Sequence, residues 1–413
     1  MFLVYAPENK EKAFLTWATV NFAANIENSR WYDLYYKGVI GGFSAFYQVM
    51  PLYEKIDEYR GNETREIRFY PIKLSDNEFE NFKNHLEEVC DKSYPYRFFT
   101  NNCAHGIYQL LFDSLENIPE PTQSLLSPLD VVAILHQENR LLDPFLMPPL
   151  KENIQKISDA EHAELEFMEW QNRSGKIGFD SDREQKLANL RHLISARSVE
   201  TIEMFVPYQK WIEPHRYNRI EVSALYNEGK YSTLVSYRPI LHDQTDNHYF
   251  YSSTNTFEIL STSIQFHVDR VSLQSLDFVN MRLMPIHDKW FRHWSYVFYA
   301  GYKDNKFVGK IGIGKSIYLL EKQKIALEFI LTDQQRNEKN YIGFETQLIK
   351  HTIGKIRYGI LYEHLYENFS NENIRLLNPW VAIDINKSFG VYLESNYSNK
   401  SPFYGKLALR HYF

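Results

Sequence analysis

The stretch Ile264-Gln-Phe-His-Val-Asp269 alternates apolar and polar side chains, which is the pattern of a β-strand with one buried face. The same period of two returns at Ile325 to Phe329, Val381 to Ile385 and Leu407 to Leu409. Segments rich in Asn, Ser and Asp, residues that favour turns, separate these runs. We therefore predict an antiparallel sheet over residues 219–413, with room for about eight strands that close into a β-barrel.

Aromatic residues are unusually frequent in this chain. The 30 Tyr, 28 Phe and 7 Trp together make up 16% of the 413 residues. Such a bias favours strands and the aromatic bands of membrane barrels. The closing Tyr412-Phe413 resembles the last strand of bacterial outer-membrane barrels. Lys310, Glu328 and Glu345 would then need a polar lumen, and a soluble barrel is the alternative.

The charge and cysteine counts exclude several classes of protein. The 46 Lys+Arg against 52 Asp+Glu give a net charge of −6, which excludes a dedicated nucleic-acid binder. The two cysteines cannot form a disulfide framework and lack CxxC spacing, and no HExxH occurs, so we expect no metal or cofactor. No apolar run is long enough for a membrane helix, and no signal peptide is recognisable.

The first half of the chain divides into two further zones. Residues 1–149 mix short apolar runs with helical periodicity, which predicts an α+β domain. Its clearest helix starts at Ser75, where Ser75-Asp-Asn-Glu78 has the form of a capping box, and Cys90 on that helix is expected to be a small core residue. Residues 150–218 carry two amphipathic stripes, one with Leu165 and one with Leu187, and are expected to form a helical connector.

The segment Tyr96-Arg-Phe-Phe-Thr-Asn-Asn-Cys-Ala-His-Gly-Ile-Tyr-Gln-Leu-Leu111 predicts a chemical site. Its apolar spacing starts a helix at Cys103, with Asn101 or Asn102 as the N-cap. A helix N-terminus favours the thiolate, the form of cysteine that attacks carbonyls, and first-turn amides can hold an oxyanion. Cys103 is therefore a candidate nucleophile, and the alternative is a structural thiol.

The same segment resembles known thiol enzymes. Asn102-Cys-Ala-His105 resembles the Asn-Cys-x-His element of acyltransferases related to lecithin:retinol acyltransferase, and more distantly the cysteine helix of NlpC/P60 hydrolases. Together with Val20-Asn-Phe-Ala-Ala-Asn25 and Tyr36-Lys-Gly-Val-Ile-Gly-Gly-Phe43, it is similar to the Lnb family, bacterial envelope proteins assigned to lipoprotein N-acylation. Ser236-Tyr-Arg-Pro-Ile-Leu-His-Asp243 and the β-rich tail resemble the C-terminal part of long members.

The resemblance implies a fold, a reaction and a location. The fold would be a papain-like (NlpC/P60-like) α+β thiol domain, a helical connector and an antiparallel β-barrel, in the periplasm and outer membrane. Cys103 would take an acyl group from a phospholipid as a thioester and pass it to a lipoprotein N-terminus. Asn101, Asn102 and Cys103 match the family motif as they stand.

The general base is the departure from the family. It is expected to be a histidine in a Gly-His pair leading into the first strand, and here the sequence starts at Met1-Phe-Leu3 within that strand. This suggests a shortened N-terminus that has also lost a signal peptide. His105 could substitute, but it lies two positions along the helix, a rotation of about 200°, so we expect it to point away from Cys103.

Substrate contacts and rival functions complete the predictions. Tyr36, Lys37, Gly38 and Gly42 are candidate residues for binding a phosphate head group, with a tight hairpin as the alternative. His242-Asp243 is expected to form a salt-bridged junction with Arg238. The rival enzyme is a thiol peptidase or amidase acting on cell-wall peptide. The non-enzyme rival is an envelope barrel with a degenerate thiol domain.

Overall fold

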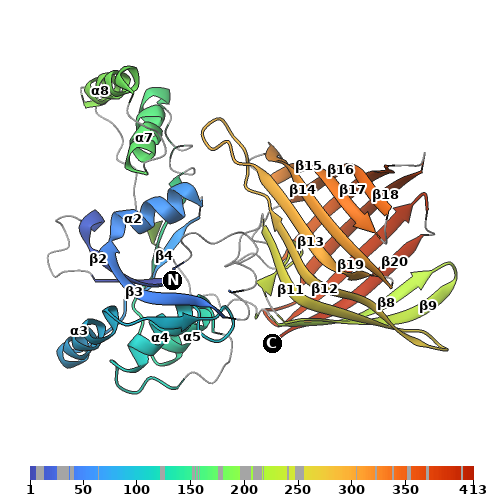
Figure 1. Ribbon diagram of the computed structural model, residues 1–413, viewed down its shortest axis with the longest axis horizontal. Helices are drawn as coiled ribbons and strands as arrows, with labels where there is room; N and C mark the ends of the chain where they lie inside the picture. The colour runs from blue at the N-terminus through green and yellow to red at the C-terminus, as the bar shows by residue number, and fades with distance from the viewer. Residues whose placement is uncertain are drawn as a thin grey trace. The chain divides into compact units, whose positions relative to one another are not determined.

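A computed structural model shows two compact units, residues 1–212 (the N-terminal unit) and residues 213–413 (the barrel unit). The structure describes residues 1–5, 14–25, 37, 41–63, 65–120, 126–150, 154, 157, 159–174, 180–195, 206–207, 216, 218–239, 241–246, 255–303, 305–320, 323–336, 339–350, 355–368, 372–400 and 403–413. Each unit is described by itself below (Figure 1).

The N-terminal unit is built on a four-stranded antiparallel sheet in the order β1-β2-β3-β5. Its strands are β1 (Phe2–Val4), β2 (Ala18–Ala24), β3 (Phe43–Pro51) and β5 (Tyr94–Tyr96). A smaller sheet contains β4 (Ile67–Phe69), β6 (Phe145–Met147) and β7 (Val206–Pro207). The helices are η1 (Phe14–Thr16), α2 (Leu52–Ile56), the π-helical turn η2 (Asp57–Asn62), α3 (Asp76–Cys90), α4 (Cys103–Phe112) and α5 (Pro128–Gln137). This arrangement confirms an α+β unit.

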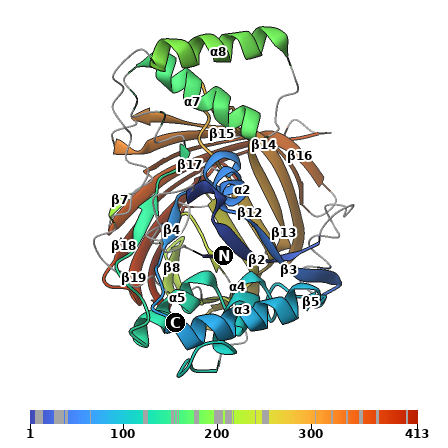
Figure 2. The same cartoon turned by 90° about the vertical axis from the view of Figure 1, so that its left-hand side faces the viewer.

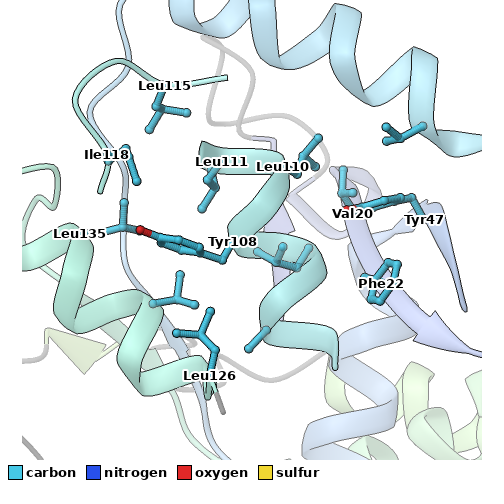
Figure 3. Packing of buried hydrophobic residues seen from close by; sticks show 14 of the residues in the cluster. Val20, Phe22, Tyr47, Tyr108, Leu110, Leu111, Leu115, Ile118, Leu126 and Leu135 are labelled. Carbon is cyan, nitrogen blue, oxygen red and sulfur yellow. The ribbon is translucent and has the colours of Figure 1, made fainter. Parts of the chain in front are cut away.

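Helix α4 forms the centre of the core of this unit. Its buried face packs on β2 and β3, and Figure 3 shows Tyr108, Leu110 and Leu111 between the sheet residues and Leu135 of α5. The capping box at Ser75 is confirmed at the start of α3. Cys90 packs against the same core, as expected of a small apolar residue, and burial raises the pKa of its thiol.

Two antiparallel helices follow in the chain, α7 (Ala160–Arg173) and α8 (Ser181–Ser195). Leu165 and Met168 of α7 pack against Leu187 and Leu190 of α8, so the two predicted amphipathic stripes face each other in a helical pair. In the described part of the chain, no helix combines the length and apolarity needed to cross a bilayer.

The barrel unit is a closed ring of twelve described strands, seen from the side in Figure 1 and from the end in Figure 2. The ring closes because β20 pairs with β8 and β9 pairs with β11, and the two-residue β10 (Leu241–His242) lies beside β11. The strands are β8 (Arg219–Asn227), β9 (Lys230–Arg238), β11 (Asn255–Phe266), β12 (Val271–Leu283), β13 (Ser295–Lys303), β14 (Lys306–Leu320), β15 (Ile325–Arg336), β16 (Lys339–Lys350), β17 (Ile356–Glu367), β18 (Asn373–Asp384), β19 (Phe389–Ser398) and β20 (Tyr404–Tyr412).

The expected barrel is confirmed, but the expected count of about eight strands was wrong. Short connections, such as the Glu228-Gly229 turn between β8 and β9, leave room for more strands than the clearest alternating runs indicated. Glycines and lumen-facing polar residues also weaken the alternation in strands such as β14.

Side chains of the barrel point alternately outward and inward. The outward face is apolar: Val222, Ile311, Ile313, Leu331, Leu348, Ile360, Leu393, Leu407 and Leu409 are all exposed. Exposed aromatic residues lie toward both ends of the strands: Tyr226, Tyr231, Phe266, Phe307, Tyr366, Tyr397 and Phe403 at one, and Tyr237, Trp294, Tyr296, Tyr358, Phe389 and Phe413 at the other. Lys310, Glu328 and Glu345 face inward, as a polar lumen requires. This is the pattern of a barrel that spans a membrane.

Candidate active site around Cys103

Cys103 is the first residue of α4, and its half-exposed thiol is held in place by Asn102. The Asn102 Oδ1 accepts hydrogen bonds from the backbone N–H groups of Ala104 (2.8 Å) and His105 (3.1 Å). Its Nδ2 donates to the carbonyl oxygens of Phe98 (3.0 Å) and Leu126 (2.9 Å). Asn102 is therefore the N-cap, and its buried side chain ties the first turn of α4 to two loops.

Asn101 closes the turn that precedes the helix. Its backbone exchanges hydrogen bonds with Arg97 at 2.9 and 3.1 Å, and its side-chain Nδ2 donates to the carbonyl of Pro95. Of the two predicted cap residues, Asn102 is the cap and Asn101 shapes the loop. Both set the position of Cys103.

His105 lies on the first turn of α4 and joins the same cap. Its ring Nδ1 is 3.2 Å from Asn102 Oδ1, so the imidazole contacts the cap residue.

Two tyrosines that the sequence did not assign to the site lie beside the thiol. Tyr96 of β5 accepts a hydrogen bond from the backbone N–H of Cys103. Burial, supported by the neighbouring thiol, raises the pKa of Tyr96 to about 12. Burial also raises the pKa of Tyr59 in η2, with smaller contributions from Glu58, Glu63 and Cys103. Both hydroxyls are therefore protonated at neutral pH and can donate a hydrogen bond.

The entrance to β1 also faces the thiol. The backbone amino nitrogen of Met1 is 3.9 Å from Cys103 Sγ, and the ring of Phe2 lies 5.7 Å from the ring of Tyr59. The position that leads into β1 is therefore next to the candidate nucleophile.

The structure describes two of the four residues predicted to bind a phosphate head group, Lys37 and Gly42. Tyr36 and Gly38 lie outside the described residues. Lys37 packs along Gly42, where an added Cβ would be 3.2 Å from Lys37 Cγ, and its Nζ is 5.8 Å from the Phe43 ring centroid. Arg97 packs in the same way on Gly41, with its Nε 3.1 Å from the place of an added Cβ.

Both glycines have positive φ, 104° for Gly41 and 143° for Gly42, which other residues rarely adopt. The chain thus brings two cations to one glycine pair at the start of β3, and β3 pairs Phe43 with Tyr96. Arg97 was not among the predicted residues, because it is far from Gly41 in sequence.

The comparisons with known proteins add a family for part of the chain. Residues 1–138 match the model of the Lnb N-terminal periplasmic domain. Residues 213–412 match a second model, described as domain of unknown function DUF7840. No match was found among curated proteins.

Solved structures similar to the barrel unit are outer-membrane proteins at low identity. The KdgM porin in complex with disordered oligogalacturonate is 11% identical, with 47% of this chain and 99% of that chain covered and a TM-score of 0.32. The NanC porin is 6% identical, with 48% and 99% covered and a TM-score of 0.33. Omp33 of Acinetobacter baumannii is 11% identical, with 48% and 99% covered and a TM-score of 0.30.

The match to a periplasmic domain and the apolar outer face of the barrel agree on a location. The chain is a cell-envelope protein with a periplasmic N-terminal domain and a barrel of outer-membrane type. The predicted periplasmic and outer-membrane location is confirmed.

Proposed function

We propose that the N-terminal unit is a cysteine-dependent acyltransferase. The Cys103 thiolate attacks the ester carbonyl of a phospholipid, which forms a thioester and releases the lysolipid alcohol. The α-amino group of a lipoprotein then attacks the thioester carbonyl, which forms an amide and frees the thiol. A thiol suits both steps because it is a good nucleophile and a good leaving group. The acceptor comes from the resemblance to the Lnb family.

The setting of Cys103 is the observation that carries this proposal. The thiol is partly accessible at the first residue of a helix, next to a protonated tyrosine, in a unit that matches the Lnb N-terminal periplasmic domain. A purely structural thiol would need neither access nor hydrogen-bond donors at this point.

The oxyanion site would be smaller than the sequence suggested. We expected several first-turn amides to hold the oxyanion, but the N–H groups of Ala104 and His105 already donate to Asn102 Oδ1. The Tyr96 hydroxyl, which interacts with the thiol, is a further donor at this place. We assign the oxyanion to the Tyr96 hydroxyl, which turns its hydrogen toward the new charge while its oxygen keeps the hydrogen bond from the Cys103 N–H.

The general base belongs to the position that leads into β1. The Met1 nitrogen lies 3.9 Å from Sγ, and the resemblance expects a histidine at this entrance. His105 is less suited to the role because its ring contacts the cap residue Asn102. We therefore assign His105 to positioning the helix start.

A negatively charged head group would bind at the glycine pair. Lys37 and Arg97 lie along Gly42 and Gly41, and a phosphate between them would meet two cations and backbone that carries no Cβ. The strand pairing of Phe43 with Tyr96 connects this place to the thiol site.

The test is the intact mass of the purified full chain after incubation with phospholipid in detergent. We expect a gain of one fatty-acyl group that hydroxylamine removes and that Cys103→Ala lacks, while the matched control Cys90→Ala keeps it. A form extended by Gly-His ahead of Met1 should gain the acyl group faster. Cleavage of a cell-wall peptide without lipid would instead establish the peptidase. Absence of any adduct in the extended form would establish a degenerate domain.

A further inference from the structure

The segment Asp243–Asp246, here called the lumen strap, lies between β10 and β11. Its side chains pack tightly against their surroundings: Gln244 is 6% exposed and Asp246 is fully buried at 0%. Asp243 Oδ1 accepts hydrogen bonds from the backbone N–H and hydroxyl of Thr245, so the strap is a folded turn. It is therefore a packed part of the barrel unit.

Both ends of the strap, Asp243 and Asp246, bind the strands where the ring closes. Asp246 is 2.9 Å from Arg219 Nη1 on β8, pairs with Arg238 on β9, and accepts a 2.8 Å hydrogen bond from the Tyr412 hydroxyl on β20. Arg238 also pairs with Asp243 at 3.2 Å, so the predicted salt bridge between these two residues is confirmed. This salt bridge lies within the barrel unit, where it joins β9 to the lumen strap.

The middle of the strap, Gln244 and Thr245, reaches the other strands of the wall. Gln244 Nε2 donates to Glu328 Oε1 on β15 at 3.3 Å, and β15 is six strands from β8 in either direction around the ring. Between these walls, Arg357 of β17 donates to the Thr245 carbonyl at 3.1 Å and Arg410 of β20 to the Thr245 hydroxyl at 2.6 Å. The strap therefore spans the full width of the lumen.

A second connection folds into the same end of the barrel. Met284 and Phe291, between β12 and β13, are 0% and 2% exposed. Ile286 between them pairs with Ser316 of β14. It packs against a cluster of buried residues from β15, β16, β18, β19 and β20: Ala326, Ile349, Trp380, Ala382, Tyr392 and Ala408. This end of the lumen thus contains a hydrophobic core.

Both segments close the periplasmic end. Their contacts lie at the start of β8, β15 and β17 and at the end of β9 and β20, which is the end where the chain enters from residues 1–212. Those residues contain the periplasmic domain. In most bacterial barrels the periplasmic connections are short turns and the outer ones are long. Here the lumen strap and the connection 284–294 lie at the end where β8 starts, and Glu228-Gly229 is a tight turn at the opposite end.

We propose that this barrel is a closed membrane anchor, not a diffusion channel, and that the lumen strap is its seal. A solute would have to displace buried ion pairs whose partners would then be left uncompensated, which is costly inside a protein. The strap connects six strands of the wall (β8, β9, β11, β15, β17 and β20), so it also stiffens the ring against opening.

Conductance of the full-length protein in planar lipid bilayers tests the proposal. The wild type should show no stepwise current, whereas the strap variant Asp243→Gly, Gln244→Ser, Thr245→Gly, Asp246→Ser should show discrete openings. The milder variant Gln244→Gly, Thr245→Gly keeps the Asp246 ion pairs and should open less often. Folding of each variant is checked by the mobility shift between heated and unheated samples in electrophoresis.

A control variant distinguishes the loss of the seal from a general effect of removing charged side chains. Lys339→Gln, Glu367→Gln removes an exposed 3.0 Å ion pair at the other end of the barrel and should be as silent as the wild type. Stable stepwise conductance of the wild type would overturn the proposal. Silence of both folded strap variants would equally overturn the strap as the seal.

Discussion

Asn102 is the neighbour that ties Cys103 most directly to the surrounding loops. Asn102 uses both of its side-chain groups, one on the α4 amides and one on the carbonyls of Phe98 and Leu126. A cysteine at a helix start needs such a cap because the first amides of a helix have no partner within the helix. The same cap removes two of those amides from catalysis, which gives Tyr96 its importance.

Tyr96→Phe should slow thioester formation on Cys103 by about 10²-fold, since it removes one donor from the oxyanion site. Burial holds the pKa of Tyr96 at about 12, so the wild-type donor should persist through mildly alkaline pH. The measurement is the rate of acyl-adduct formation by mass spectrometry. Tyr53→Phe, which removes an exposed hydroxyl on α2, is the control and should leave the rate unchanged. An equal loss in both variants would remove Tyr96 from the site.

At the scale of elements, α4 is positioned by its close approach to the sheet. A Cβ at Gly106 would lie 2.3 Å from the ring of Phe22 on β2, and the Gly106 carbonyl accepts a 2.8 Å hydrogen bond from the Tyr47 hydroxyl on β3. The glycine lets the helix lie against the strands only three residues after Cys103. A change that moves α4 relative to the sheet therefore also moves the Cys103 thiol.

Gly106→Ala should destabilise the N-terminal unit by about 1–3 kcal/mol, because the added methyl group overlaps the Phe22 ring. The helix would have to move, so the Cys103 adduct should also form more slowly. Hydrogen exchange of the α4 amides measures the first effect. Gly106→Ala, Phe22→Leu supplies space and should restore part of the protection. Full protection in Gly106→Ala alone would contradict the packing argument.

A buried ion pair should make the same unit sensitive to acid. Burial would raise the pKa of Glu78, but hydrogen bonds from Ser75, Arg140 and Glu116 outweigh it and hold the pKa at about 2. The ionised carboxylate then contributes about 3 kcal/mol of stability above its ordinary pKa, and this is lost as the pH falls from about 4.5 toward 2.

Glu78→Gln should therefore be less stable at neutral pH and should lose this part of the acid sensitivity. Far-ultraviolet circular dichroism follows the change, because the α-helices that the structure describes all lie in the N-terminal unit. Glu80→Gln on the exposed side of α3 should keep the wild-type profile. Parallel acid profiles of wild type and Glu78→Gln would contradict the assignment.

For the whole molecule, the sequence predicted what depends on local pattern and missed what depends on distant contacts. Alternation identified the barrel because its outer face is apolar and its lumen polar. The Cys103 helix start was readable from its cap and apolar spacing. Tyr59 and Arg97 reach the site only through folding. The strap was hidden for the same reason, since Asp246 bonds to Tyr412, 166 residues away.

Because the barrel lies in the outer membrane, the cost of a charge on its outward face should depend on the depth of that residue in the bilayer. Ile313 lies outward at the middle of β14, and Phe307 lies outward near its start in one of the aromatic groups. Because the cost of a charge is greatest at the bilayer midplane, Ile313→Arg should destabilise the folded barrel by about 2–4 kcal/mol and Phe307→Arg by about 0–1 kcal/mol. Denaturant unfolding of the full chain in lipid vesicles measures both. In a barrel surrounded by water, both positions would be equally hydrated, so the two substitutions would cost the same. Equal costs would therefore place this face of the barrel outside the membrane.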